Sequence, residues 1–219
     1  MDDHAALLEE IAQEMRETER WTGRSALSPQ VMRAMAKVKR EAFIAPGSET
    51  AAYENRPLPI GHSQTISQPF VVALMTELLD LERDDRVLEV GTGSGYQAAV
   101  LAEVVDKVHS IEVIPELAAR AALALAGQGY AKVELRTGDG GLGWPDRAPF
   151  DAIVVTAAAL DVPPALLAQL GTGGRMVIPV GPHRGDQELM LITKDAAGNV
   201  TRRSVLPVAF VPLTGSACD

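Results

Sequence analysis

The sequence predicts an α/β fold with a doubly wound, Rossmann-like sheet that is mostly parallel, ends in an antiparallel C-terminal hairpin and is preceded by N-terminal helices. Two observations carry this prediction. After Asp84 and Asp85, short apolar runs of strand length alternate with helix-like segments, and this alternation implies parallel pairing through right-handed crossovers. From residue 187 onward, two strand-like stretches follow each other with only a turn between them, which indicates a hairpin.

The N-terminal part of the chain is predicted to be helical. Residues 5–20 place apolar side chains at helical spacing among charged ones, the pattern of an amphipathic helix. A second helix is expected to begin at Ser28 and Pro29, an N-cap residue followed by proline in the first helical position. Residues 45–48 end the segment that follows, and residues 70–81 return to a helical pattern.

The remaining elements follow in order. The strand candidates are residues 86–90, 108–112, 132–136, 151–156 and 175–180, and the helix candidates are residues 94–105, 115–127 and 163–170. The two last strands, 187–193 and 200–211, are joined by turn-forming residues 195–199. We expect a single domain over residues 1–219, in which residues 1–80 supply helices and an active-site loop and residues 81–219 form a cofactor-binding core.

Composition and charge narrow the function classes. The net charge is −9 and Lys and Arg form no cluster, so we expect no nucleic acid partner. The start of the chain lacks a signal-peptide pattern, and no apolar run approaches the roughly 20 residues that span a bilayer. We therefore expect a cytoplasmic protein with no membrane partner. Cys218 is the only cysteine, which excludes an intrachain disulfide or a cysteine-rich metal site, and we expect it to have no role.

The most informative stretch is residues 86–96, where an apolar strand leads into Gly91, Gly93 and Gly95 and then into a helical segment. Glycines at alternate positions suit a tight strand-to-helix turn where a ligand approaches the backbone. A dinucleotide fingerprint needs its third glycine where this chain has Tyr96, which disfavours NAD and FAD. The alternative is a glycine-rich turn that binds nothing.

Three acids follow three successive strand candidates. Glu89 precedes the glycines, where it would repel a pyrophosphate but attract a cationic amino acid group. Glu112 lies where an acid can bind the ribose hydroxyls of an adenosyl ligand, and Asp139 could reach an adenine amino group. S-adenosylmethionine (AdoMet) carries an ammonium and a sulfonium but no phosphate, so it fits this acidic cradle best. Solvated strand-end carboxylates and a loop-forming Asp are the alternatives.

At this point the chain resembles the protein-L-isoaspartate O-methyltransferases. The resemblance runs from about residue 30 to about residue 214 and includes the glycine motif. Residues 65–69 (Thr-Ile-Ser-Gln-Pro) and 210–213 (Phe-Val-Pro-Leu) are the segments most specific to this family; the others are residues 57–64, 87–96, 138–140, 150–158 and 173–181. The resemblance implies an AdoMet-dependent methyltransferase fold and a role in protein repair.

The resemblance also implies site residues. Gln64, Thr65, Ile66 and Ser67 would form a loop over the methionine end of AdoMet, with Ser67 as the active-site hydroxyl and Thr65 beside it as the two catalytic residues. The further cofactor contacts would be Glu89, Gly91, Ser94, Glu112, Asp139, Gly140 and Thr214. Ala157 and a Phe210–Val211 strand would lie against the substrate. Ser63 departs from the family, whose members often have a glycine there.

The implied reaction is methyl transfer to the α-carboxylate of L-isoaspartyl residues in damaged proteins, which starts repair through a succinimide. A carboxylate is already ionised at pH 7, so the chemistry needs neither a strong general base nor a metal. The expected partners are isoaspartyl proteins and peptides, and a monomer is favoured. One rival is an AdoMet methyltransferase acting on a small molecule or RNA; another is a binding module that senses AdoMet without turnover.

Overall fold

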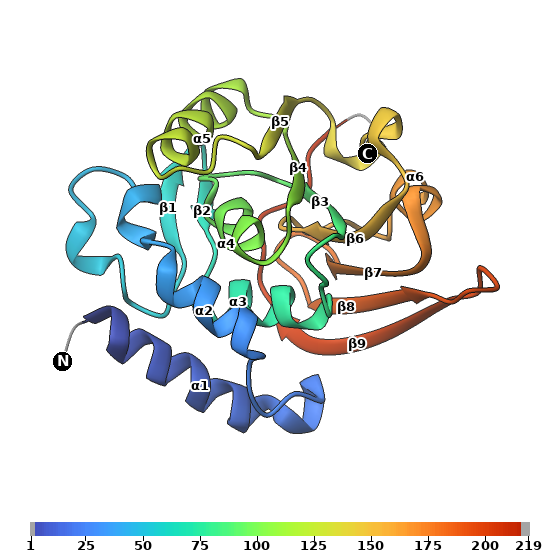
Figure 1. Cartoon of the computed structure of the whole chain (residues 1–219), viewed down its shortest axis with the longest axis horizontal. Helices are drawn as coiled ribbons and strands as arrows, with labels where there is room; N and C mark the ends of the chain where they lie inside the picture. Colours follow the sequence, from blue (N-terminus) through green and yellow to red (C-terminus); the bar gives the residue numbers. More distant parts are fainter. Residues whose placement is uncertain (1–2, 216–219) are drawn as a thin grey trace.

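The computed structural model of this chain describes residues 3–215, and the expectation for Cys218 lies outside them. A seven-stranded sheet crosses the molecule in the order β5-β4-β3-β6-β7-β8-β9 (Figure 1). Its strands are β3 (Arg86–Val90), β4 (Lys107–Glu112), β5 (Glu134–Thr137), β6 (Phe150–Val155), β7 (Leu170–Val180), β8 (Gln187–Lys194) and β9 (Val200–Val208). The strands from β5 to β7 pair in parallel, whereas β8 and β9 pair antiparallel. The predicted Rossmann-like sheet with its C-terminal hairpin is confirmed.

The helices are α1 (Asp3–Thr22), α2 (Pro29–Lys37), α3 (Pro69–Leu78), α4 (Tyr96–Val104), α5 (Pro115–Gly127) and α6 (Pro164–Gln169). Short 3₁₀ turns lie at η1 (Arg40–Phe43), η2 (Glu49–Ala51), η3 (Gly140–Leu142) and η4 (Pro145–Arg147), and β1 (Leu58–Gly61) and β2 (Gln64–Ile66) form a separate hairpin. The predicted start of α2 is confirmed, since the Ser28 hydroxyl accepts a hydrogen bond from the Val31 amide at 3.4 Å.

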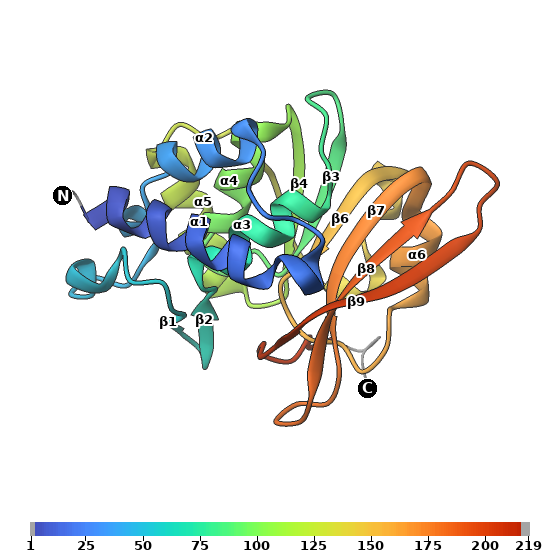
Figure 2. The same cartoon turned by 90° about the horizontal axis from the view of Figure 1, so that it is seen from below.

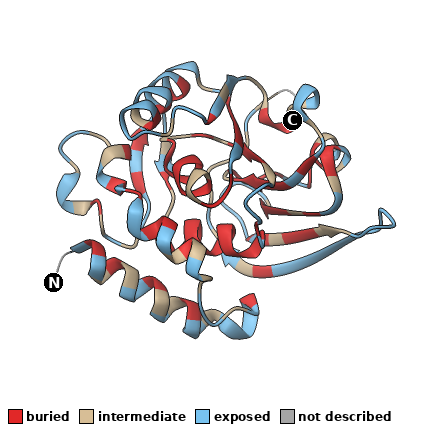
Figure 3. Ribbon diagram, viewed as in Figure 1, coloured by how far each residue is buried: buried red, intermediate tan, exposed pale blue. Residues whose placement is uncertain are grey.

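Side chains alternate between the two faces of the sheet, as strand geometry requires. Val87 and Val154 belong to a core shared with α1–α5, whereas Leu88 and Val155 belong to a second core shared with α6. Figure 2 shows the corresponding layers, with α1 to α5 grouped on one side and α6 on the other. All ten residues of α3 are buried, and in the view of Figure 3 this helix lies above the partly exposed α1.

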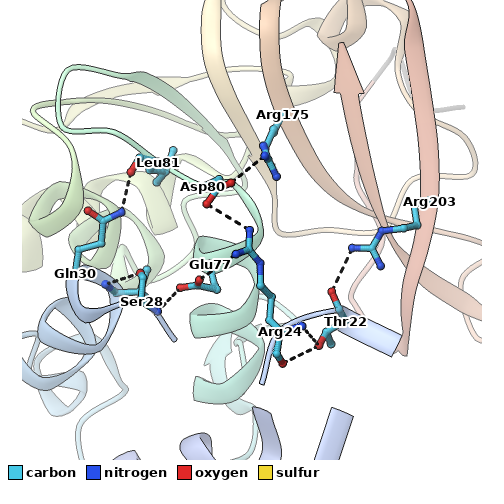
Figure 4. A network of polar contacts seen from close by, with 10 residues as sticks. Thr22, Arg24, Ser28, Gln30, Glu77, Asp80, Leu81, Arg175 and Arg203 are labelled. Carbon is cyan, nitrogen blue, oxygen red and sulfur yellow. Dashed lines mark hydrogen bonds and ion pairs between the residues drawn. The ribbon is translucent and has the colours of Figure 1, made fainter. Parts of the chain in front are cut away.

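Polar contacts tie the N-terminal helices to the sheet (Figure 4). Arg203 of β9 donates to two main-chain carbonyls at the end of α1, at 3.0 and 3.2 Å. Asp80, just after α3, pairs with Arg24 at 3.3 Å and with Arg175 of β7 at 2.9 Å. The Arg203 contacts join α1 to β9, and the Asp80 pairs join the segments after α1 and α3 to β7.

Two expected boundaries are wrong for reasons of backbone conformation. The helix expected from residue 94 begins at Tyr96, because Gly95 has a left-handed φ of +91° that cannot continue a helix. The strand expected from residue 175 begins at Leu170, because β7 pairs there with Phe150 across an irregular register. Three glycines between residues 171 and 174 concealed this part of the strand, since glycine is depleted in strands.

The expected strand over residues 200–211 is also wrong at its end. β9 stops at Val208, and Phe210 is held outside the sheet because its amide and carbonyl both bond the Gln187 side chain, at 2.7 and 3.2 Å. The chain then runs beside the end of β6, where Ala158 exchanges two backbone hydrogen bonds with Val211 and Leu213, at 2.8 and 2.7 Å. Phe210 and Val211 are therefore part of a connecting segment rather than of a strand.

The order in which the chain adds strands to the sheet indicates where a ligand-binding site lies. The chain moves outward from β3 through β4 to β5 and then returns to start β6 on the opposite side of β3. At such a reversal the connections leave in opposite directions, which opens a crevice at the carboxyl ends of the two central strands.

Candidate functional site

A cleft opens at this reversal, at the carboxyl ends of β3, β4 and β6. Its empty space, with the open mouth included, is about 730 Å³. It is lined by Gln64, Thr65, Ile66, Ser67, Val72, Glu89, Val90, Gly91, Thr92, Gly93, Ser94, Tyr96, Gln97, Ile111, Glu112, Val113, Ile114, Leu117, Gly140, Thr156, Ala157, Val211, Pro212, Leu213 and Thr214.

The glycine turn forms the floor of the cleft. Gly91 has φ +95°, and a Cβ built on it would lie 2.5 Å from the Thr156 hydroxyl oxygen. That hydroxyl donates to the Gly91 carbonyl at 2.6 Å, so β3 and β6 are joined directly under the cleft. Only glycine satisfies both the left-handed backbone and the close approach of Thr156.

Glu89 is a buried carboxylic acid beneath the cleft. It is 0% exposed, and its Oε2 accepts a hydrogen bond from the Ser110 hydroxyl at 2.5 Å. Its Oε1 has no hydrogen-bond partner among the described residues. Burial raises the pKa of Glu89 to about 8, partly opposed by the Ser110 hydrogen bond. A cation that enters the cleft would stabilise the ionised form of Glu89, because burial has removed the water that would otherwise do so.

The other two predicted acids differ in position. Glu112 lines the cleft, and its two oxygens accept hydrogen bonds from the Gly93 and Ile114 amides, at 2.8 and 2.9 Å. It therefore shapes the glycine turn as well as facing the cleft. Asp139 does not line the cleft: its carboxylate accepts from the Gly141 amide at 2.9 Å and caps η3. Gly140 is the part of this segment that reaches the cleft wall.

The segment of residues 64–67 was expected as a loop, but its first part is a strand. Gln64–Ile66 forms β2, which pairs antiparallel with β1, and α5 holds the hairpin through an Arg120 hydrogen bond to the Ile60 carbonyl at 2.6 Å. At the hairpin turn, His62 and Ser63 have φ of 53° and 57°. This left-handed conformation favours glycine, so a glycine at position 63 would adopt it with less strain than Ser63 does.

A second hollow, here called the groove, adjoins the cleft. It lies between α1, the start of α3 and the end of the β9 segment, and it is lined by Glu14, Thr18, Pro57, Thr65, Ser67, Gln68, Phe70, Val71, Thr156, Leu206, Pro207, Val208, Ala209, Phe210 and Val211. Four residues line both hollows: Thr65, Ser67, Thr156 and Val211. The cleft and the groove therefore meet at the two predicted catalytic hydroxyls.

Glu14 brings α1 into the wall of the groove. Its carboxylate accepts hydrogen bonds from Asn55 at 2.8 Å and from Gln68 at 3.3 and 3.4 Å. Asn55 in turn accepts from the Phe70 amide in the first turn of α3, at 3.0 Å. Burial raises the pKa of Glu14, opposed by these hydrogen bonds. Gln68, the residue next to Ser67, is therefore hydrogen-bonded to Glu14 of α1.

Of the predicted site residues, those that line the cleft are Gln64, Thr65, Ile66, Ser67, Glu89, Gly91, Ser94, Glu112, Gly140, Ala157, Val211 and Thr214. Phe210 lines only the groove, and Asp139 lines neither hollow. Sequence analysis missed Thr156, which a search for polar residues at the ends of central strands could have found. It also missed Glu14 and Gln68, for which the sequence offers no local signal.

Residues 3–215 were compared with the patterns of metal-binding groups and of membrane-spanning helices. Within residues 3–215, no group of three or more His, Cys, Asp or Glu side chains is arranged to hold a metal ion. No helix in the same range combines the length and the apolar character that crossing a bilayer requires.

The chain is similar to proteins of one family. A family model described as Protein-L-isoaspartate(D-aspartate) O-methyltransferase matches residues 10–217. "Protein-L-isoaspartate O-methyltransferase 2" of Syntrophobacter fumaroxidans is 56% identical over 211 residues, covering 96% of this chain and 85% of that protein. The protein of the same name from Polaromonas sp. is 54% identical over 209 residues, covering 95% of this chain and 99% of that one.

Solved structures share the fold. One, titled protein-L-isoaspartate O-methyltransferase, matches with a TM-score of 0.81 at 26% identity and covers 96% of this chain and 67% of that one. A Plasmodium falciparum protein assigned to the same enzyme, in complex with S-adenosyl-L-homocysteine, has a TM-score of 0.79 at 23% identity and covers 98% of this chain and 99% of that one. At that identity the second likeness shows the fold alone.

Proposed function

This chain belongs to the protein-L-isoaspartate(D-aspartate) O-methyltransferase family, and on that premise we propose how its cleft and groove methylate an isoaspartyl residue. The enzyme is an AdoMet-dependent methyltransferase that transfers a methyl group to the α-carboxylate of L-isoaspartyl residues in damaged proteins and thereby starts their repair through a succinimide. In the proposal, the cleft binds AdoMet and the groove binds the peptide. The observation that carries it is that the two hollows meet at Thr65 and Ser67.

The cleft suits AdoMet in charge and shape. Glu89 has an unpartnered buried oxygen that an ammonium group would satisfy, and Glu112 faces the cleft at the end of the next strand, where an acid can accept hydrogen bonds from ribose hydroxyls. Gly91 and Gly140 line the cleft with main-chain atoms, because a Cβ on either would meet Thr156 or Val90. When bound, AdoMet supplies an electrophilic methyl group on a sulfonium. The roles of Gln64, Ser94 and Thr214 in holding it, and of Asp139 near the adenine, are part of the same proposal.

The protein's own contribution is to position the carboxylate. Ser67 and neighbouring backbone amides hold the substrate carboxylate at the boundary between groove and cleft, with Thr65 beside it. Ala157, Phe210 and Val211 contact the peptide. Holding reactants in line can supply roughly 7 to 11 kcal/mol of the barrier reduction. Because the nucleophile is ionised at pH 7, no side chain has to remove a proton from it.

The test of this function is direct. A synthetic L-isoaspartyl peptide incubated with AdoMet labelled in its methyl group should acquire a base-labile methyl ester. No ester on any isoaspartyl peptide, together with methylation of a small-molecule acid, would favour the small-molecule rival. AdoMet binding without turnover of either substrate would favour the binding-module rival.

Ser67→Ala should lower kcat for the isoaspartyl peptide about 10- to 150-fold, because a hydrogen bond to a charged group contributes roughly 1.5–3 kcal/mol. The peptide KM should change less than kcat, since the bond is strongest near the transition state. Steady-state kinetics measure both constants. Ser48→Ala, which removes a half-buried hydroxyl just before η2, is the matched control. Wild-type kcat in Ser67→Ala would exclude this role.

AdoMet binding at pH 7 should release a proton from Glu89. With a pKa of about 8 in the empty site, Glu89 is roughly nine-tenths protonated at pH 7. A bound ammonium favours the carboxylate and lowers this pKa, so affinity rises with pH up to about 8. Calorimetry in two buffers of different ionisation enthalpy should give a release of about 0.9 proton per AdoMet relative to Glu89→Gln, which corrects for the ligand's own amine. Equal proton release by both proteins would contradict the assignment.

The proposal extends to the setting of the reaction. The chain acts as one methyltransferase domain, in which residues 1–80 carry the helices and active-site segment and residues 81–219 carry the AdoMet core. It acts as a monomer on isoaspartyl proteins and peptides in the cytoplasm, and on neither nucleic acid nor membrane. The net charge of −9 supports a protein rather than a nucleic acid substrate.

A further inference from the structure

Arg40, in η1, has the largest of the fully buried side chains and is 0% exposed. Its guanidinium makes no ion pair with a carboxylate within residues 3–215. Instead it donates only to main-chain carbonyls: Nη1 to Ala52 and Glu54, at 2.7 and 3.3 Å, and Nη2 to Arg56 and Ser67, at 3.0 and 3.1 Å. Burial lowers the pKa of Arg40 to about 10.

One nitrogen of this group joins two separate parts of the chain. Nη2 binds both the Arg56 carbonyl, just before β1, and the Ser67 carbonyl, just after β2. These are the two ends of the β1–β2 hairpin that carries Thr65 and Ser67. Because the guanidinium is planar and rigid, its two bonds set the separation and orientation of the hairpin ends.

Arg40 is also close to one residue of the cleft wall, although it does not line the cleft itself. Its guanidinium carbon is 6.0 Å from the centre of the Tyr96 ring, a buried side chain at the cleft wall and the first residue of α4. The same group therefore contacts the frame of the cleft and the segment that presents the catalytic hydroxyls.

The free-energy cost of burying the Arg40 charge indicates that its hydrogen bonds have a specific role. A buried charge without an ion pair is costly, and an apolar side chain of similar volume would fill the same space at lower cost. What an apolar residue could not do is hold four carbonyls of two segments at fixed angles.

We propose that Arg40 is a positioning residue, which holds the Ser67 main chain against the cleft so that the Ser67 hydroxyl meets the substrate carboxylate in line with the methyl group. This inference rests on the proposed function of the site. It assigns Arg40 no contact with substrate or cofactor.

The test compares Arg40→Lys with the wild type. Lysine keeps the charge and much of the volume but cannot bond Arg56 and Ser67 with one planar group. We expect kcat for the isoaspartyl peptide to fall about 10- to 100-fold, since small misplacement of reacting groups has effects of this size. AdoMet affinity by calorimetry should stay within about threefold, and amide hydrogen exchange of residues 64–70 should increase.

Two controls separate positioning from stability. Arg86→Lys removes another arginine bond to a main-chain carbonyl, that of Arg147, at the opposite end of β3 from the cleft, and should leave kcat unchanged. Leu166→Ala in the α6 core lowers stability without touching the site, and assays run well below both melting temperatures should show normal kcat.

Unchanged kcat in folded Arg40→Lys would overturn the proposal, as would a loss of kcat without faster exchange of residues 64–70. If Arg40→Lys does not fold, Arg40→Gln carries the same expectation, and failure of both to fold assigns Arg40 a role in folding alone. An inactive wild type would refute the proposed function. Hydrogen exchange needs no turnover, so it would still measure whether Arg40 anchors the hairpin.

Discussion

A peptide with one L-isoaspartyl residue is expected to be methylated about 10⁴-fold more efficiently, in kcat/KM, than the same peptide with L-aspartate. In isoaspartate the free carboxylate is on the α-carbon and the peptide chain continues through the side chain, so the carboxylate and the chain exchange places. A site that holds the carboxylate at Ser67 and the chain along Phe210 and Val211 can accept only one arrangement. The other isomer must misplace its carboxylate or leave buried polar groups unpaired.

The measurement uses matched synthetic peptides and methyl-labelled AdoMet. Normal L-aspartyl peptide should give essentially no ester, and the ester of the isoaspartyl peptide should decay through a succinimide and return part of the material as aspartate. A scrambled isoaspartyl peptide of the same composition controls for sequence effects. Equal methylation of the two isomers would show that the groove does not discriminate as proposed.

Gly91→Ala is expected to weaken AdoMet binding by at least about 100-fold, or roughly 2.7 kcal/mol. A non-glycine residue in the left-handed region costs roughly 1 to 3 kcal/mol, and here φ is +95°. The added Cβ would also lie 2.5 Å from the Thr156 hydroxyl, which bonds the Gly91 carbonyl. Relief of either strain moves the cleft floor or separates β3 from β6.

Calorimetric titration with AdoMet measures this loss. Gly127→Ala is the matched control, because Gly127 ends α5 and a Cβ there meets nothing within 4 Å. Alanine favours helix over glycine by up to about 1 kcal/mol, so this variant should bind AdoMet normally and be no less stable. An affinity in Gly91→Ala equal to that of Gly127→Ala would remove Gly91 from the cradle.

The fold class, and the strand ends that line the cleft, could be predicted from the sequence alone. Strand-length apolar runs and helical periods are local properties, so the order of strands and helices could be read from neighbouring residues. Gly91, Gly93, Glu89 and Glu112, which line the cleft, could be placed together because parallel strands bring their carboxyl ends to one edge. The boundaries were less certain where glycine interrupts β7.

Only the tertiary structure decided how the active-site segment is held. Arg40 reaches Ser67 across 27 residues, and Glu14 reaches Gln68 across 54, so no local period or motif signals either contact. The same holds for Phe210, which the Gln187 side chain draws out of β9 from 23 residues away. Such outcomes depend on which distant group satisfies each buried polar atom, and that choice is made only when the chain packs.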